Sequence, residues 1–121
     1  MDVDAITDYH AHIYFDADSE ADAQAVRDAI DGRFDVVLGS WHHREVGPHT
    51  RWMYQVLFAP ELFASFVPWL ALNRRGLAVL VHPQSGDSIA DHTDHAIWMG
   101  EVLDVKVDVL EAFEKKRAAG G

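Results

Sequence analysis

The stretch from Tyr9 to Phe15 constrains the fold most, because it alternates polar and apolar side chains with a period of two. Successive side chains of a β-strand point to opposite faces of a sheet, so this stretch predicts a strand with two unlike faces. Two histidines two positions apart on one face can contact the same metal ion or small polar ligand. The alternative is that they are ordinary polar residues on the solvated face of an antiparallel sheet. The polar face would carry His10, His12 and Tyr14, and the apolar face Ala11, Ile13 and Phe15.

The segments that follow predict a βαββαβ order of elements. Apolar and β-branched runs predict strands at residues 34–38, 51–58 and 77–81, and apolar stripes predict helices at 19–32 and 60–73. This order is typical of a ferredoxin-like α+β sandwich, in which two helices cover one face of a four-stranded antiparallel sheet. We therefore expect the first strand to lie between the third and the fourth. Its histidines would point to a face without helices, and an extra strand or helix would follow at the C-terminus.

The length of the chain predicts one domain. Its 121 residues, of which 49% are hydrophobic, are enough for a single packed core. We expect a flexible arm at residues 1–8, a single domain at 9–104 and a C-terminal extension at 105–121 with a disordered end. Within residues 103–110 the alternation of valine with charged residues favours a short strand, and 111–117 favours a helix. The first residues lack the character of a signal peptide, and no segment reaches membrane-spanning length, so we expect a cytoplasmic location.

Composition excludes several classes of function. The chain has 20 acidic and 10 basic side chains, and the resulting net charge of -10 would repel nucleic acids and anionic membranes. It has no cysteine, which excludes disulfides, thiolate zinc sites, iron–sulfur clusters and a cysteine nucleophile. Any transition metal must therefore be bound by imidazole and carboxylate groups.

Histidine is the unusual component. Seven of the eight histidines have another histidine within seven positions. In the predicted sheet the first and fourth strands are antiparallel, which places His82 near His10, and His49 precedes the third strand and should approach Tyr14. With His12, these histidines are the candidate metal ligands: His10, His12, His49 and His82.

Non-heme iron sites that activate oxygen commonly use two histidines and a carboxylate. The carboxylates that could complete such a site are Glu45, Asp87, Asp91 and Asp94. No compact His-Glu-x-x-His motif is present. Two alternatives remain open: each histidine could be a hydrogen-bonded structural residue, or the histidines could transfer protons without a metal.

Aromatic side chains near the predicted site could form a pocket for a flat aromatic ligand. The alternative is that they form the core or a subunit contact, because a sheet face without helices is often buried by dimerisation. We expect both, namely a pocket closed by a second subunit of a homodimer. The candidate substrate-binding residues are Tyr14, Trp41, Trp52 and Tyr54, with Trp98 nearby.

Over residues 8–104 the sequence resembles the DOPA 4,5-dioxygenase family of fungi and bacteria. The resemblance rests on Tyr9-His-Ala-His-Ile-Tyr-Phe, Val46-Gly-Pro-His-Thr, His82-Pro with Ser85-Gly-Asp, and Asp91-His-Thr with Ala96-Ile-Trp-Met-Gly. It implies a ferredoxin-like domain, often dimeric, that opens a catechol ring with dioxygen at an iron centre. The histidines that match the family's motifs are His10, His12, His49, His82 and His92.

The leading interpretation is an oxidoreductase that carries out extradiol cleavage of a catechol such as DOPA with iron(II) and O₂. Another divalent metal is the alternative to iron. His12, His49 and His82 are the first choices as ligands, followed by His10. The acid–base group would be His92 or His43. The competing interpretation is a non-catalytic dimeric domain that binds a small aromatic ligand or a metal.

Overall fold

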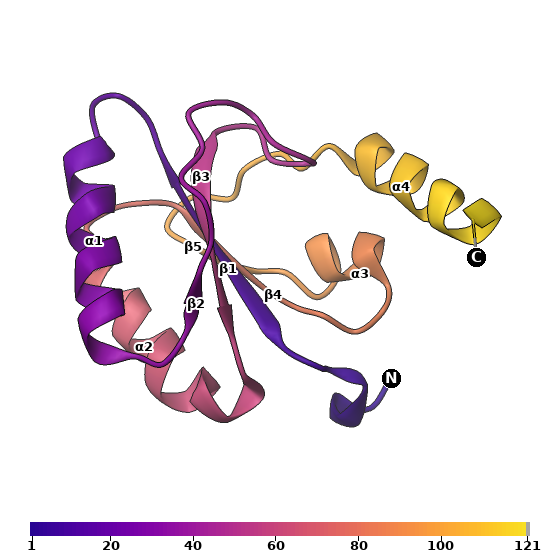
Figure 1. Cartoon of the computed structure of the whole chain (residues 1–121), viewed down its shortest axis with the longest axis horizontal. Coiled ribbons are helices and arrows are strands. Elements are labelled where there is room, and N and C mark those ends of the chain that lie inside the picture. The colour runs from indigo at the N-terminus through magenta and orange to yellow at the C-terminus, as the bar shows by residue number, and fades with distance from the viewer. Residues whose placement is uncertain (121) are drawn as a thin grey trace.

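The structure is a computed structural model that describes residues 1–120. It is an α+β fold built on one antiparallel five-stranded sheet with the order β2-β3-β1-β4-β5 (Figure 1). The strands are β1 (Tyr9–Phe15), β2 (Val37–Leu38), β3 (Trp52–Phe58), β4 (Val79–Pro83) and β5 (Ile97–Met99). The prediction that the first strand lies between the third and the fourth is confirmed. The predicted number of four strands is wrong, because β5 pairs with the free edge of β4.

Two helices cover one face of the sheet. These are α1 (Glu20–Arg33) and α2 (Phe63–Asn73), the second preceded by the short 3₁₀ turn η2 (Pro60–Leu62). Helix α1 presents Ala23, Val26 and Ile30 to the sheet, which is the three- and four-residue spacing of an amphipathic helix. The main core lies between these helices and the strands (Figure 1). Burial of each large aliphatic or aromatic side chain there stabilises the fold by about 1.5–3 kcal/mol.

Strand β1 separates the core from the polar side of the molecule as the sequence predicts. Ala11, Ile13 and Phe15 lie in the main core. Tyr14, by contrast, packs with Leu80 and other residues on the opposite face. Strand β1 is hydrogen-bonded to β3 on one side and to β4 on the other. It therefore lies at the centre of the sheet, which holds its side chains in fixed positions.

The opposite face is not free of helices. The short helix α3 (Ser88–His92) and the C-terminal helix α4 (Val107–Gly120) lie on this side, away from α1 and α2 (Figure 1). Segment 86–95, which has no periodic apolar pattern, forms α3 because the Asp87 carboxylate caps the helix by accepting from the Ala90 N–H. The prediction of a face without helices is therefore wrong, and it no longer supports the expectation that dimerisation buries this face.

The two chain ends also differ from the simplest expectation. The N-terminal arm contains a 3₁₀ turn, η1 (Val3–Ala5), and Thr7 pairs with the backbone of Gln84. At the other end, Val105 forms only an isolated bridge, to His49. Helix α4 begins at Val107, so residues 107–110 are helical and not part of the strand expected at 103–110. The expected disordered end includes Gly121, which lies outside the described residues. Among residues 1–120 no helix combines the length and apolar character needed to cross a membrane.

Candidate metal centre

Five histidines converge on the polar side of the sheet, and their nearest nitrogens form two groups that could hold a metal ion. One group is His10, His12 and His82, and the other is His12, His49 and His92. Within each group one nitrogen of each residue lies within 4.8 Å of the others. His12 belongs to both groups, so it is the centre of the cluster. No carboxylate enters either group among the described residues, which is unlike the predicted set of two histidines and a carboxylate.

The register of the sheet explains this convergence. In the β1–β4 pair His10 lies directly opposite His82, and in the β1–β3 pair His12 lies opposite Gln55. Side chains on opposed positions share a face, which brings these residues together without any special loop. The other two histidines come from irregular segments. His49 is anchored by its bridge to Val105, and its ring centre lies 4.1 Å from that of His12.

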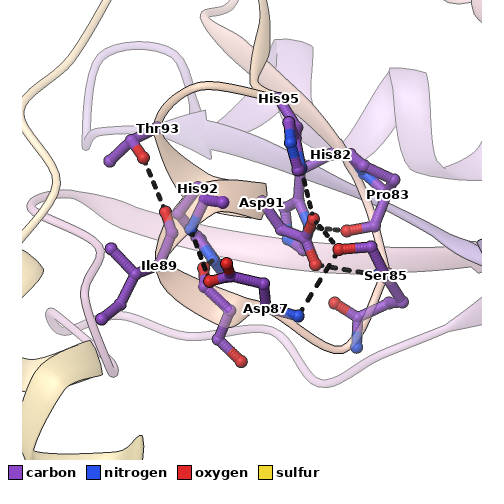
Figure 2. Close-up of polar contacts among 12 residues, drawn as sticks. His82, Pro83, Ser85, Asp87, Ile89, Asp91, His92, Thr93 and His95 are labelled. Atoms are coloured by element: carbon purple, nitrogen blue, oxygen red, sulfur yellow. Dashed lines mark hydrogen bonds and ion pairs between the residues drawn. The ribbon is translucent and has the colours of Figure 1, made fainter. Parts of the chain in front are cut away.

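His92 extends from the end of α3 toward the cluster. Its ring centre lies 4.1 Å from that of His82, and its Nδ1 atom lies 2.7 Å from the Ser88 carbonyl oxygen (Figure 2). A carbonyl can only accept, so Nδ1 carries the proton and Nε2 has a free lone pair. His82 is arranged in the same way, because its Nδ1 donates to the Pro83 carbonyl at 3.0 Å. Such contacts to the second nitrogen are typical of histidines that bind metals.

The hydrogen bonds also permit a metal-compatible state in His12 and His49. His82 Nε2 is an acceptor, so the 3.0 Å contact between the Nε2 atoms requires His12 Nε2 to donate. The buried Nδ1 of His12 is then an acceptor, and it has no hydrogen-bond partner. His49 Nδ1 lies 2.7 Å from the Tyr14 hydroxyl, which can accept its proton and leave Nε2 free. An unpartnered buried nitrogen is costly without a ligand, so these residues fit a bound metal ion.

Burial keeps the clustered histidines neutral. Desolvation, with smaller contributions from neighbouring histidines, lowers the pKa of His49 to about 3. Desolvation also lowers the pKa of His82 to about 3, and it holds that of His12 well below the usual 6.5. The pKa values of His10 and His92 are lowered for the same main reason. Neutral imidazole is the form that coordinates metals, so the cluster is ready to bind an ion at neutral pH.

The same shifts predict that the metal-free protein loses stability in mild acid. The unfolded chain protonates His49 and His82 near pH 6.5 but the folded chain only near pH 3, so stability is complete above about pH 6.5 and falls as the pH falls toward 3. Each histidine contributes a slope of about 1.4 kcal/mol per pH unit. Urea unfolding at pH 7.5 and pH 5 should show a loss of about 2–4 kcal/mol. Equal stability at both pH values would contradict the assignment.

The cluster forms the floor of a cavity of about 290 Å³. This volume is near the lower end for small-molecule sites, which suits a single-ring ligand. The C-terminal helix α4 supplies an apolar wall through Val109, Leu110 and Phe113, and Gln55 and Gln84 add neutral polar groups. These five residues were missed from the sequence. Only Gln55 gave a signal, because it interrupts the apolar strand 51–58 on the same face as Met53 and Leu57.

Beside the cavity, the buried carboxylate of Asp91 holds the loop that leads into α3 (Figure 2). It accepts hydrogen bonds from the Ser85 backbone N–H at 2.9 Å, from the Ser85 hydroxyl at 2.6 Å and from His95 Nδ1 at 2.8 Å. Burial alone would raise the pKa of Asp91, but these hydrogen bonds hold it below its ordinary value. Asp91 therefore acts on the structure around His92, and it does not join the histidine groups.

Several predicted site residues lie elsewhere. Trp41, Trp52 and Tyr54 pack into or against the main core on the α1–α2 side, and the Tyr54 hydroxyl donates to the Ala23 carbonyl at 3.0 Å. The structure therefore does not bring these three residues to the histidine cluster. Their position follows from β3, where Tyr54 lies opposite Ile13 on the apolar face of β1. Tyr14 is the one predicted substrate-binding residue that contacts the cluster, through His49.

His43 is also separated from the cluster. Its imidazole contacts the Glu20 carboxylate and the Trp41 indole N–H, on the side of α1. Of the candidate carboxylates, Glu45 pairs with Lys106 at 2.6 Å, and Asp87 caps α3. The site is therefore a cluster of histidines, without a carboxylate among the described residues, on the floor of a small cavity. These features indicate an α+β protein that can bind a metal ion.

Comparisons with known proteins place the chain in a family. The model of the Dopa 4,5-dioxygenase family matches residues 9–109. A DOPA 4,5-dioxygenase of Amanita muscaria is 36% identical over 104 residues, which are 78% of this chain and 46% of the relative. An uncharacterised 21.2 kDa protein of Botryotinia fuckeliana is 42% identical over 82 residues, which are 61% of this chain and 45% of the relative. The chain thus spans less than half the length of these curated relatives.

A solved structure is similar over nearly the whole fold. It is the crystal structure of a protein from Nostoc punctiforme that is described as a candidate dioxygenase. It has 44% sequence identity and a TM-score of 0.92, and the match covers 93% of this chain and 98% of that one. The chain belongs to the DOPA 4,5-dioxygenase family, and the resemblance drawn from its motifs is confirmed.

Proposed function

We propose that the chain is a ring-opening dioxygenase that cleaves a catechol such as DOPA in the extradiol manner with non-heme iron(II). The observation that supports the proposal is the convergence of five neutral histidines on the floor of one small cavity, in a member of a dioxygenase family. In this reaction one carbon–carbon bond beside a hydroxyl-bearing carbon breaks, and both atoms of O₂ enter the product. Iron(II), when bound, supplies a Lewis acid and a template for the catechol oxygens and O₂.

His12, His49 and His92 are the residues we assign to the ion. Each has one ring nitrogen engaged in a hydrogen bond, and the proposal gives the free lone pair to the other nitrogen. His82 Nε2 accepts a hydrogen bond from His12 Nε2 at 3.0 Å, which fixes the orientation of the His12 ring. This assignment moves His92 from the expected acid–base role to metal binding, and His82 from metal binding to positioning.

His10 is the residue we assign to proton transfer. It lines the cavity, and its Nε2 lies 3.6 Å from the Asp8 carboxylate. Burial lowers the pKa of His10, while the charge of Asp8 acts in the opposite direction. His10 is therefore neutral at pH 7 and can accept a proton from a catechol hydroxyl, and Asp8 then stabilises the imidazolium that forms.

Replacing His49 and His10 separately should distinguish these two roles. His49→Ala should weaken iron(II) binding by at least about 100-fold, since losing even an outer partner of a metal ligand costs 10- to 100-fold. His10→Ala should weaken it by less than about tenfold but should lower kcat by about 100-fold or more. Anaerobic calorimetric titration and oxygen uptake measure the two effects. A larger loss of affinity in His10→Ala would place the ion in the other histidine group.

The activity is tested by giving catechols to protein that has been loaded with iron(II) without oxygen. With DOPA, catechol or 4-methylcatechol we expect oxygen uptake and a yellow product whose mass is that of the catechol plus one O₂. Absence of turnover across the panel would contradict the proposed function. Binding of a catechol without oxygen uptake would instead support a non-catalytic domain that binds small aromatic ligands.

The assembly state belongs to the proposal as well. A homodimer remains a prediction that sedimentation measurements can test. Helices α3 and α4 lie on the histidine side of the sheet (Figure 1), and α4 already contributes Val109, Leu110 and Phe113 to the lining of the cavity.

A further inference from the structure

In the part of the chain that the structure describes, no cationic side chain lines the cavity above the histidines. Among the described residues the lining consists of the five histidines, the neutral polar residues Gln55, Gln84 and Ser88, and an apolar and glycine remainder. Ligand sites that take carboxylates usually present arginine or lysine to them, because an unpaired carboxylate is costly to remove from water. This cavity offers no such partner.

Two cationic side chains close in sequence to lining residues are already paired. Arg117 of α4 donates to the Glu114 carboxylate at 2.7 Å and to the Gly86 carbonyl at 3.4 Å. Lys106, just before α4, pairs with the Glu45 carboxylate at 2.6 Å. Neither residue lines the cavity. An anionic substituent would therefore have to displace an existing acidic partner to pair with either of these two side chains.

The acidic side chains of the protein also disfavour an anionic substituent, whereas the charge of bound iron(II) acts at the two catechol oxygens, which every catechol shares. Asp8 places a carboxylate 3.6 Å from the ring of His10, which is part of the lining. The chain as a whole carries a net charge of -10. A negative field lowers the local concentration of anionic ligands and raises that of cationic ones.

We infer that the site selects catechols whose ring substituent is neutral or cationic and discriminates against catechols with an anionic substituent. The inference rests on the proposed function and specifies its substrate class. It follows from the residues that line the cavity and from the acidic group beside it. A zwitterionic substituent, with no net charge, falls between the two extremes.

Three catechols that differ mainly in charge test the inference. They are 4-ethylcatechol, which is neutral, dopamine, which is cationic, and 3,4-dihydroxyphenylacetate, which is anionic. Their dissociation constants are measured without oxygen on the iron(II)-loaded protein, and oxygen uptake is then measured with each. We expect the anionic catechol to bind at least about tenfold more weakly than 4-ethylcatechol, and dopamine to bind equally well or more tightly.

A charge added inside the cavity provides the matched variant. Gln84 lines the cavity, and its backbone is held on both sides by Asp8 and Thr7, so Gln84→Arg changes the lining with little change to the fold. It should improve binding of the anionic catechol relative to 4-ethylcatechol by roughly tenfold. Gln24→Arg adds the same charge to the exposed surface of α1, on the other side of the sheet, and should change that ratio by less than about twofold.

The outcomes separate this inference from the proposed function. Cleavage of all three catechols with equal affinities would overturn the selectivity and leave the dioxygenase assignment intact. An equal response of the ratio to Gln24→Arg and Gln84→Arg would also overturn it, because the effect would then come from net charge alone. Failure of every catechol to bind would overturn the proposed function and the selectivity together. The ligand ranking on the unmodified protein stands even if Gln84→Arg fails to fold.

Discussion

His12→Ala is expected to abolish both metal binding and catechol cleavage. His12 is the residue that the two histidine groups share, and its Nδ1 is a buried nitrogen without a hydrogen-bond partner. Its removal takes one ligand from either group, so iron(II) affinity should fall by more than the 10- to 100-fold that loss of an outer partner costs. Turnover should fall by at least about 1,000-fold, because binding, orientation and activation of the catechol all depend on the ion.

The control for this prediction is His43→Ala. His43 is an imidazole of the same chain, but it contacts Glu20 and Trp41 on the α1 side of the sheet. It should retain the iron(II) affinity and the turnover of the unmodified protein within about twofold. Anaerobic metal titration and an oxygen electrode measure the two quantities. If His12→Ala still binds iron(II) tightly, the histidine cluster is not the metal centre.

Asp91→Ala should have the largest effect on stability. The carboxylate is 1% exposed and accepts three hydrogen bonds, from the backbone and hydroxyl of Ser85 and from His95. The substitution leaves these donors without a partner and removes a buried charge-assisted network. The free energy of unfolding should decrease by about 2–4 kcal/mol. Because His92 is the next residue along the chain, iron(II) affinity should decrease as well.

Asp94→Ala is the matched control for Asp91→Ala. Asp94 lies on the same segment, but its side chain is exposed. Its replacement should change the free energy of unfolding by less than about 0.5 kcal/mol. Urea unfolding of both variants at pH 7.5 measures the difference. Equal stability of the two variants would show that the Asp91 network contributes little to the fold.

The central strand and its polar face were predictable from the sequence. The alternation in Tyr9–Phe15 fixes the faces of β1, and the antiparallel register brings His82 opposite His10. The approach of His49 to Tyr14 was also predicted, and the structure confirms it with a contact of 2.7 Å. These features depend on local periodicity and on pairing rules, which a sequence expresses directly.

The short helix α3 and the start of α4, which lie beside the site, were not predictable from sequence periodicity. Helix α3 has five residues, too few to show a period, and it depends on its cap at Asp87 and on the buried contacts of Asp91. Val105, Val107 and Val109 alternate with charged residues as in a strand, yet Val105 forms only an isolated bridge and the other two valines lie in α4. The position of Tyr54 could have been inferred from the sequence. It lies two residues before Val56 and four before Phe58, so it points to the same face of the strand, and those two residues face the core.

The ratio of O₂ to catechol consumed by iron(II)-loaded protein tests the central claim most directly. An oxygen electrode measures the O₂, and chromatography measures the loss of catechol in the same sample. Ring opening by a dioxygenase predicts one O₂ for each catechol, with no change when catalase is added, because both oxygen atoms remain in the product. A ratio of one O₂ to two catechols, or a ratio that catalase lowers, would show oxidation of the catechol without ring opening. Either of these results would contradict the account.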